Sequence, residues 1–200
     1  IYTFDNSVQI EVQNPRLWYP VGYGEQNLYD FKLRAESMGE TDEYSCRIGL
    51  RVCELVKDND EYGTSMYFRV NGIPVFAKGS NYVPEDSILT RCSRERTYNL
   101  LKQAVKGNQN IIRVWGGAFF PHDYFFDICD ELGLLVWQDL MFACAQYPNT
   151  PEFYKSIARE TEDNVKRIRN HACLALWCGN NECETALKDW WNLPQKDLDD

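Results

Sequence analysis

The sequence predicts an α/β fold, in which a β-rich N-terminal part precedes the first half of a (β/α)8 barrel. Residues 1 to about 57 alternate apolar and polar side chains with the two-residue period of strands. Beyond residue 75, apolar strands alternate with amphipathic helices, as in a parallel sheet covered by helices. Polar residues follow each apolar strand, where a barrel carries its functional rim.

The N-terminal part reads as short strands separated by turn chemistry. Strands are expected over residues 8–12, 28–35 and 45–52, with turns at Asn14-Pro15 and Tyr19-Pro20 between the first two. Strands at this spacing suggest a β-sandwich. A polar stretch at residues 58–63 marks a candidate boundary. We therefore divide the chain into a sandwich over residues 1–60 and a barrel segment over residues 61–200.

The second part opens with a predicted hairpin, because Asn71-Gly72 separates two apolar runs. Four strands then alternate with three helices that carry an apolar face. The strands are expected at 75–79, 111–115, 134–137 and 174–178, and the helices at 94–106, 121–132 and 151–169. Gly107 and Gly133 are placed to end the first two helices.

Two architectures accommodate four such units, a doubly wound sheet and half of a barrel. A nucleotide-binding doubly wound sheet carries a glycine-rich phosphate loop after its first strand. Lys78-Gly79-Ser80-Asn81 follows the first strand here, and it matches neither G-x-G-x-x-G nor a P-loop. This favours the barrel.

Composition excludes several function classes. Thirty acidic residues against 21 basic ones give a net charge of −9, and no basic patch for nucleic acid is visible. No apolar run of about 20 residues could span a membrane. Cys173, Cys178 and Cys183 are spaced by five, but no histidine pair follows them, so we read the cysteines as buried thiols. We expect neither a metal nor a cofactor.

Asn181-Glu182, at the end of the fourth predicted strand, is the strongest candidate for chemistry. Glycoside hydrolysis needs two carboxyl groups, one of which protonates the leaving oxygen. A carboxyl at the end of an apolar strand should be partly desolvated, which suits a general acid. The amide of Asn181 could bind a sugar hydroxyl. A polar strand-to-helix turn with an N-cap is the open alternative.

Other strand-end residues could support this chemistry. Asp139 is either a substrate contact or a partner of Arg113, and Arg113 could orient a carboxylate by a bidentate pair. Trp115 and Trp137 could each be a wall for a sugar ring or part of the barrel packing, and we favour Trp115 as a wall because it lies nearer the rim. His122 and His171 are isolated, and we read both as structural.

Several segments together resemble the β-mannosidases of glycoside hydrolase family 2. They are Val75–Pro84, Arg113–Gly117, Cys129–Asp139, Met141–Cys144 and Trp177–Glu182, and they occur in the family's order through residues 65–190. Asn14–Pro20 resembles the immunoglobulin-like domain that precedes the family's barrel. Tyr82 departs from a frequent Trp, and Ala118 departs from a frequent third Gly; neither affects the acid/base position.

The resemblance implies a retaining exo-β-mannosidase that removes terminal β-D-mannose from the non-reducing ends of oligosaccharides. Glu182 matches the family's general acid/base, and Asn181 matches a substrate hydroxyl ligand. Trp115 and Trp190 match substrate-pocket tryptophans. Arg113 matches an arginine that supports the nucleophile. The nucleophile is a Glu near the seventh barrel strand, so we expect it outside this chain.

Two other readings compete with this one. A family 2 relative that acts on galactosides or glucuronides would share the fold, although Trp-Cys-Gly-Asn-Asn-Glu is closer to the mannosidase pattern. A catalytically inactive carbohydrate-binding relative would keep the pocket. For an animal-like protein, the resemblance implies glycoprotein catabolism in the lysosome. Half a barrel would leave an unpaired strand edge, so we expect the 200-residue chain by itself to be inactive and poorly stable.

Overall fold

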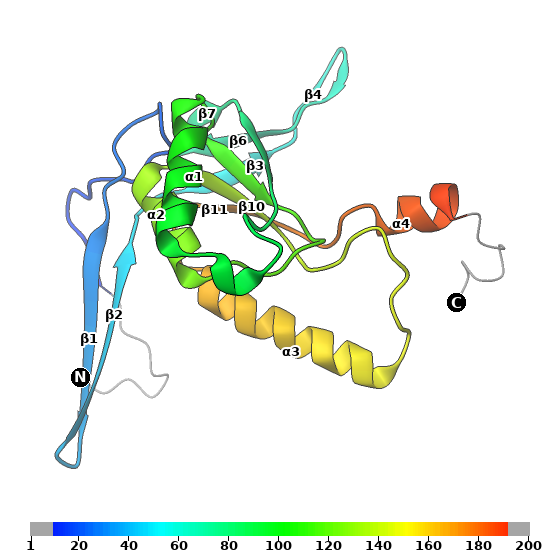
Figure 1. Ribbon diagram of the computed structural model, residues 1–200. Helices are drawn as coiled ribbons and strands as arrows, with labels where there is room; N and C mark the ends of the chain where they lie inside the picture. The colour runs from blue at the N-terminus through cyan, green and yellow to red at the C-terminus, as the bar shows by residue number, and fades with distance from the viewer. Residues whose placement is uncertain (1–9, 192–200) are drawn as a thin grey trace.

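The computed structural model describes residues 10–191 and is centred on a four-stranded parallel sheet (Figure 1). Its strands are β8 (Gly79–Tyr82), β9 (Ile111–Val114), β10 (Leu135–Asp139) and β11 (Leu174–Cys178). They lie side by side in the order in which they occur along the chain. A doubly wound sheet reverses its order at a switch point, and within the described sheet no reversal occurs.

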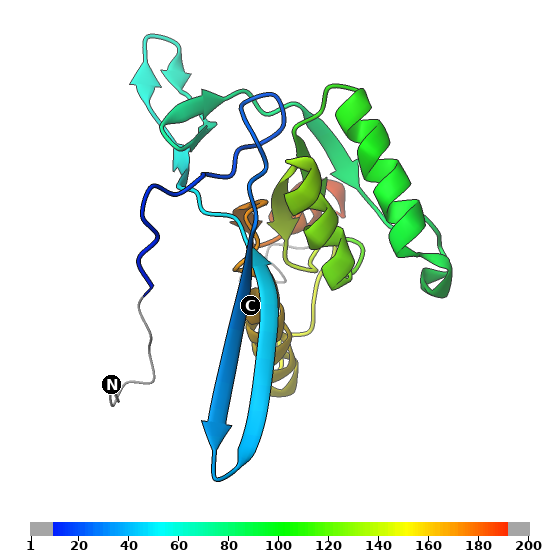
Figure 2. The ribbon, with the colours of Figure 1, turned by 90° about the vertical axis from the view of Figure 1, so that its left-hand side faces the viewer.

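Three helices connect the parallel strands: α1 (Arg94–Lys106), α2 (Asp123–Leu132) and α3 (Pro151–Ile168). Parallel strands require such crossovers. The helices α1 and α2 lie side by side on one face of the sheet (Figures 1 and 2). The predicted helices are confirmed, although α2 begins at Asp123 rather than at Pro121.

Local chemistry accounts for the helix ends. The Ser93 hydroxyl accepts a hydrogen bond from the Arg96 N–H at the start of α1, and Thr150 caps α3 in the same way. Pro151 occupies the first turn of α3, where its missing N–H costs nothing. Gly133 ends α2 with a φ of 73°, which a residue with a side chain would adopt only with strain.

Antiparallel strands make up the N-terminal third. The strands β1 (Tyr29–Ser37) and β2 (Glu40–Ile48) form a long hairpin that projects from the rest (Figure 2). A second sheet joins β3 (Cys53–Val56), β6 (Tyr67–Val70) and β7 (Ile73–Val75), and a short hairpin joins β4 (Asn59–Asp60) to β5 (Gly63–Thr64). Asn71 and Gly72 have φ of 50° and 81°, which confirms the predicted turn.

The predicted strand at 45–52 is wrong at its C-terminal end. The ladder of β2 stops at Ile48, because Gly49 packs against Trp18 and Ala172. A Cβ on Gly49 would lie 2.5 Å from the Cβ of Ala172. Leu50 then accepts a hydrogen bond from the main chain of Trp18 at 2.9 Å. Of the predicted strand at 8–12, residues 8 and 9 lie outside the described residues, and residues 10–12 form no strand.

The predicted strand at 75–79 is also wrong, because two strands meet there. The antiparallel strand β7 ends at Val75, and the parallel strand β8 begins at Gly79. The Asn110 side chain bridges the gap: its Oδ1 accepts from the Lys78 N–H at 2.9 Å, and its Nδ2 donates to the Phe76 carbonyl at 3.0 Å. A side chain far along the sequence thus replaces the ladder and lets the chain change sheets.

The division between residues 60 and 61 crosses one sheet. It falls at the tip of the β4–β5 hairpin, and β3 pairs with β6 across it. Residues 10–60 contribute the β1–β2 hairpin and two further short strands rather than two packed sheets. The β-sandwich therefore stays a prediction.

Buried polar contacts fix the N-terminal part to the base of the parallel sheet. The fully buried Trp18 donates from Nε1 to the Asp130 carbonyl at 2.8 Å. Arg51 donates from Nε to the Ala172 carbonyl at 3.0 Å, and its Nη2 donates to the carbonyl of Leu174. Among the helices of residues 10–191, none has the length and apolar character needed to cross a membrane.

Candidate active site

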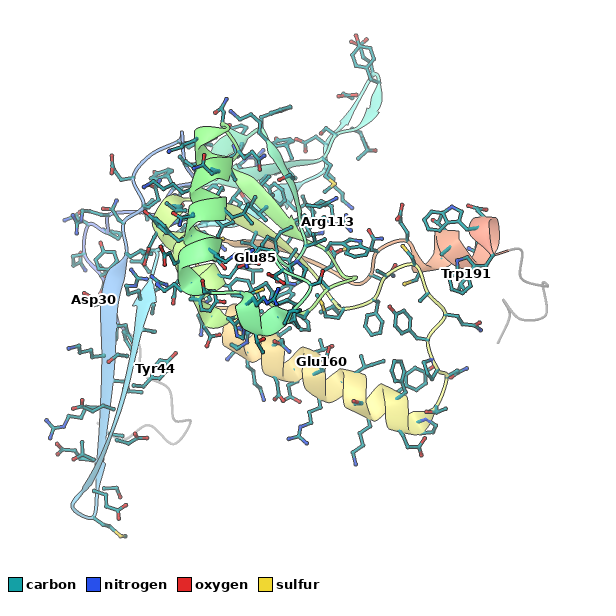
Figure 3. All side chains as sticks on the ribbon, in the orientation of Figure 1. Asp30, Tyr44, Glu85, Arg113, Glu160 and Trp191 are labelled. Carbon is teal, nitrogen blue, oxygen red and sulfur yellow. The ribbon has the colours of Figure 1, made fainter. Side chains whose placement is uncertain are left out.

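Strand-end side chains from three neighbouring strands meet at one edge of the parallel sheet. Arg113 extends from β9, Asp139 ends β10, and Asn181 follows β11. Arg113 Nε and Nη2 donate to Asp139 Oδ1 and Oδ2 at 3.2 and 2.7 Å, and Nη2 also donates to Asn181 Oδ1 at 2.6 Å. Carboxyl ends of parallel strands share an edge, so residues 113, 139 and 181 converge as predicted. Figure 3 shows Arg113 near the end of the sheet.

Asp139 is the buried partner of Arg113. Its carboxylate is fully buried and accepts four hydrogen bonds. Two come from Arg113, one from Trp137 Nε1 at 2.9 Å and one from the Gly116 N–H at 3.1 Å. An ionised carboxylate offers about four lone-pair sites, so all are taken. Of the two predicted readings of Asp139, the structure shows the partner of Arg113, and direct contact with a substrate stays a prediction.

The Arg113 guanidinium fixes how the Asn181 amide points. Arginine has donors only, so the Asn181 oxygen must face it. The Asn181 Nδ2 is thereby turned toward Glu182 and donates to its Oε2 at 3.0 Å. Asn181 is buried, and its backbone N–H donates to the Phe142 carbonyl at 2.8 Å. A connected chain of contacts thus runs from the buried Asp139 through Arg113 and Asn181 to the Glu182 carboxylate.

Glu182 lies where the main chain leaves β11 and turns into the helix α4 (Cys183–Thr185). Its φ of 56° falls in the left-handed region, which is uncommon for a residue with a side chain and recurs at functional sites. The side chain of Glu182 is exposed. The structure of residues 10–191 therefore contradicts the expectation that the Glu182 carboxyl is partly desolvated.

The two candidate tryptophans differ in how firmly they are held. Trp115 is half-buried, and its ring lies against Gly117, where a Cβ would approach within 2.0 Å of Cη2. The Trp115 ring can occupy this position because Gly117 has no side chain. Trp190 lies in the π-helical turn Ala186–Trp190 and is 52% exposed. No contact of Trp190 with Glu182 or Trp115 is seen among the described residues.

A second group of hydrogen bonds holds the loop that follows β8. Tyr82 donates from its hydroxyl to Glu85 Oε2 at 2.5 Å, and Thr97 of α1 donates to Oε1 at 2.6 Å. Burial alone would raise the pKa of Glu85, but the hydrogen bonds from Thr97 and Tyr82 outweigh it and lower that pKa. Burial, together with the hydrogen bond to Glu85, raises the pKa of Tyr82. Figure 3 shows Glu85 in front of the sheet, near α1.

A cavity of about 430 Å³ lies under this edge, on the sheet face opposite to α1 and α2. Alternate side chains of the strands line it, including Asn81, Ile111, Arg113 and Trp137, and residues around β6 and β7 close it. Arg113 lines this cavity and also bonds to Asn181 at the edge that carries Glu182, so the cavity adjoins the candidate site.

The three evenly spaced cysteines do not converge. Cys173 precedes β11 and Cys178 ends it, so they lie roughly 16 Å apart along a strand that rises about 3.3 Å per residue. Cys173 instead lies with Asp130 and His171 in a group whose potential ligand atoms are all within 4.8 Å. The oxygens of Asp130 are already bonded to the Cys173 N–H and to His171 Nδ1, both at 2.7 Å. Burial raises the pKa of the Cys173 thiol well above its usual range, which disfavours the thiolate that a metal needs.

Two residues that contribute to the candidate site were not predicted to do so from the sequence. Trp137, left open between wall and packing, donates to Asp139 and lies 5.6 Å from the Arg113 guanidinium. The two-residue period places 137 and 139 on one face of β10, so this contact was readable in principle. The Cys144 thiol accepts the second Nδ2 contact of Asn181 at 3.3 Å. This contact could not be predicted from the sequence, because a loop brings Cys144 to Asn181.

Comparisons with curated proteins agree on one family. The family model described as Glycosyl hydrolases family 2 matches residues 2–51. The chain is 46% identical over 181 residues to β-mannosidase B of Thermothelomyces thermophilus, covering 88% of this chain and 21% of that protein. It is 39% identical over 186 residues to β-mannosidase B of Emericella nidulans, covering 91% and 22%.

Solved structures include a β-mannosidase among the similar chains. A β-D-mannosidase from Dictyoglomus thermophilum matches with a TM-score of 0.82 and 47% identity, over 86% of this chain and 21% of that one. An exo-chitosanase from Amycolatopsis orientalis matches with a TM-score of 0.70 and 26% identity, over 82% and 20%. The chain spans about a fifth of the length of these proteins. For this segment, the resemblance to the β-mannosidases of family 2 is confirmed.

Proposed function

We propose that this chain is part of a retaining exo-β-mannosidase of glycoside hydrolase family 2, and that Glu182 is its general acid/base. The single observation that carries the proposal is the hydrogen-bond network that supports Glu182. Its carboxylate follows the fourth parallel strand and is linked through Asn181 and Arg113 to the buried Asp139. Polar support of this kind at the carboxyl ends of parallel strands is typical of catalytic residues.

Each residue then has a distinct part in the reaction. Glu182 gives its proton to the glycosidic oxygen and afterwards takes one from water, as a retaining mechanism requires. Asn181 Oδ1 accepts from Arg113 with one lone pair and keeps the other for a sugar hydroxyl. Arg113, neutralised by Asp139, holds this amide in place. Trp115 offers a ring face to the sugar, and Trp190 is proposed as a second wall.

The wider architecture is proposed on the same grounds. The one-directional strand order supports residues 61–200 as the first half of a (β/α)8 barrel. The family match over residues 2–51 supports residues 1–60 as the end of an immunoglobulin-like sandwich. The nucleophilic Glu is proposed to come from the barrel's second half, outside this chain. The relatives named above are fungal or bacterial, so a lysosomal location keeps only the support of the original resemblance.

A different family 2 hydrolase is the second candidate, because an exo-chitosanase shares the fold at 26% identity. A panel of aryl glycosides separates the two candidates. The full-length protein should hydrolyse an aryl β-mannoside far faster than the matching β-glucosaminide, β-galactoside or β-glucuronide. Proton NMR of the first-formed sugar should show β-mannose, because retention preserves the anomer. Hydrolysis of none of the four would support an inactive relative instead.

The role of Glu182 is tested by its dependence on the leaving group. Glu182→Ala should lower turnover on an oligosaccharide by about 100-fold or more, the usual contribution of a general acid. An activated aryl β-mannoside needs little acid assistance, so its cleavage of the first bond should suffer much less. Glu184→Ala, an exposed carboxylate two residues on, serves as the matched control and should behave like wild type. Equal losses on both substrates would contradict the acid role.

A further inference from the structure

Cys144 lies against the proposed acid/base pair although it comes from a different strand-end loop. It follows β10, whereas Asn181 and Glu182 follow β11. The main chains of the two loops are tied together: the Cys144 N–H donates to the Asn181 carbonyl at 2.9 Å, and the Asn181 N–H donates to the Phe142 carbonyl at 2.8 Å. Ala143 and Asn181 form a parallel bridge between them. The pairing of β10 and β11 thus continues past the ends of both strands.

The Cys144 thiol contacts both polar groups of the pair. Asn181 Nδ2 donates to its Sγ at 3.3 Å, and Sγ lies 3.8 Å from both Glu182 Oε2 and the Asn181 carbonyl oxygen, to either of which the thiol can donate. Asn181 Nδ2 also donates to the same Glu182 oxygen at 3.0 Å. Both N–H groups of the amide therefore have partners, one of them the thiol. The backbone of Cys144 is itself unusual, with a φ of 49° that the bridge to Asn181 maintains.

These contacts matter because Glu182 has little else to hold it. Its side chain is exposed, and its described hydrogen bonds are the two from Asn181 and Cys144. A thiol is a weak donor and a weak acceptor, and it leaves the charge of the site unchanged while neutral. A proton donor must be held close to its productive geometry, since a misplacement of about 1 Å can cost a large part of the rate.

We infer that Cys144 is a positioning residue for the general acid/base, which it orients by bridging Asn181 Nδ2 and the Glu182 carboxylate. This inference rests on the proposed function of Glu182 and adds a contributor from the neighbouring loop. Cys144 is given no contact with the sugar and no proton to transfer, and it acts only through the Asn181 amide and the Glu182 carboxylate that its thiol contacts. Its effect reaches the substrate only through the orientation of Glu182.

The test compares two variants of the full-length protein. Cys144→Ala removes all three thiol contacts and should lower turnover on an oligosaccharide with a poor leaving group on the order of tenfold. On an activated aryl β-mannoside the loss in kcat/KM, which reports cleavage of the first bond, should stay within about threefold, because that step depends little on acid assistance. Cys144→Ser keeps a donor and an acceptor and should recover most of the loss. Cys46→Ala, at a half-buried thiol of the projecting hairpin, is the matched control.

The outcomes separate this inference from the proposed function. A loss that is equal on both substrates, or a serine variant as impaired as the alanine variant, would overturn the positioning role. Thermal melting of each variant identifies a general folding defect, in which case the serine variant decides. If Glu182→Ala, assayed in parallel, shows no leaving-group dependence, the proposed function fails first. If Glu182→Ala shows leaving-group dependence and Cys144→Ala does not, only the positioning role of Cys144 fails.

Discussion

At the scale of single residues, a buried carboxylate organises a site whose reacting group is exposed. Asp139 is fully buried, whereas Glu182, which the proposal makes the proton donor, is exposed. Charges are seldom buried without partners, because desolvation is costly. The four donors around Asp139 meet this cost and at the same time fix Arg113. The buried Asp139 carboxylate therefore holds the exposed part of the site in place.

Asp139→Asn tests this interpretation. All four groups that face the carboxylate are donors, so the new amide NH2 would point at another donor and Arg113 would lose its counter-charge. Breaking a buried pair by removing one partner costs about 3 kcal/mol or more. We expect the unfolding free energy of the full-length protein, measured in urea, to fall by about that amount.

The control for this prediction is another aspartate paired with an arginine. Asp123 contacts Arg167 at 2.5 Å, but its side chain is 69% exposed. Exposed pairs contribute about 0–1 kcal/mol, so Asp123→Asn should cost little. Comparable losses in the two variants would show that burial of Asp139 does not set its importance.

At the scale of elements, the helices and the glycines that end two of them followed from the sequence, and the changes of sheet did not. The helices 94–106 and 151–168 carry apolar periodicity and capping residues close in sequence. The break at 76–78 depends on the Asn110 side chain, and the end of β2 depends on Trp18 and Ala172 packing on Gly49. These partners lie tens of residues away. Periodicity within a window of residues cannot contain that information.

The candidate site divides in the same way. That Arg113, Asp139 and Asn181 would share an edge followed from their places after parallel strands. The two readings of Asp139 could not be separated, because the choice depends on burial and on donors from Trp137 and Gly116. The exposure of Glu182 depends on how the main chain leaves β11, with a positive φ at Glu182. No residue type near position 182 predicts this conformation.

The loop that joins β8 to α1 carries a prediction for pH dependence. The hydrogen bonds from Thr97 and Tyr82 lower the pKa of Glu85, so its folded-state pKa lies below the ordinary value of about 4.3. A lowered folded-state pKa contributes stability that is present above about pH 4.3 and is lost as the pH falls through the folded value. Glu85→Gln should therefore destabilise the protein at pH 6, and the difference from wild type should shrink steadily toward pH 3.

Urea unfolding at several pH values measures this difference. Glu162→Gln is the control, because the Glu162 pKa is also lowered, by the hydrogen bond from Lys166, while both side chains are at least 60% exposed. Exposed pairs of this kind contribute little, so its curve should follow wild type at every pH. A gap for Glu85→Gln that stays constant between pH 6 and pH 3 would contradict the assignment.

At the scale of the whole molecule, one buried side chain joins the N-terminal part to the parallel sheet. Trp18 is fully buried, packs on Gly49 and donates to the Asp130 carbonyl at the end of the sheet opposite to Glu182. Its own carbonyl accepts from Asn71 Nδ2 at 2.9 Å, in the turn between β6 and β7. Three parts of the fold therefore meet at this residue. An intact candidate site at the opposite end of the sheet would not by itself preserve their arrangement.

Trp18→Ala should therefore cost about 3–5 kcal/mol, the range for removing a large buried aromatic side chain. Trp18→Phe keeps most of the volume and loses the Nε1 hydrogen bond, so it should cost only about 1–2 kcal/mol. Limited proteolysis of the alanine variant should show new cleavage in the segment between β2 and β6, since that segment loses its anchor to α2. Trp191→Ala removes a tryptophan that is 50% exposed and should stay within about 0.5 kcal/mol of wild type. If Trp18→Ala unfolds like the Trp191 variant, with an unchanged cleavage pattern, then the contacts of Arg51 rather than Trp18 hold the two parts together.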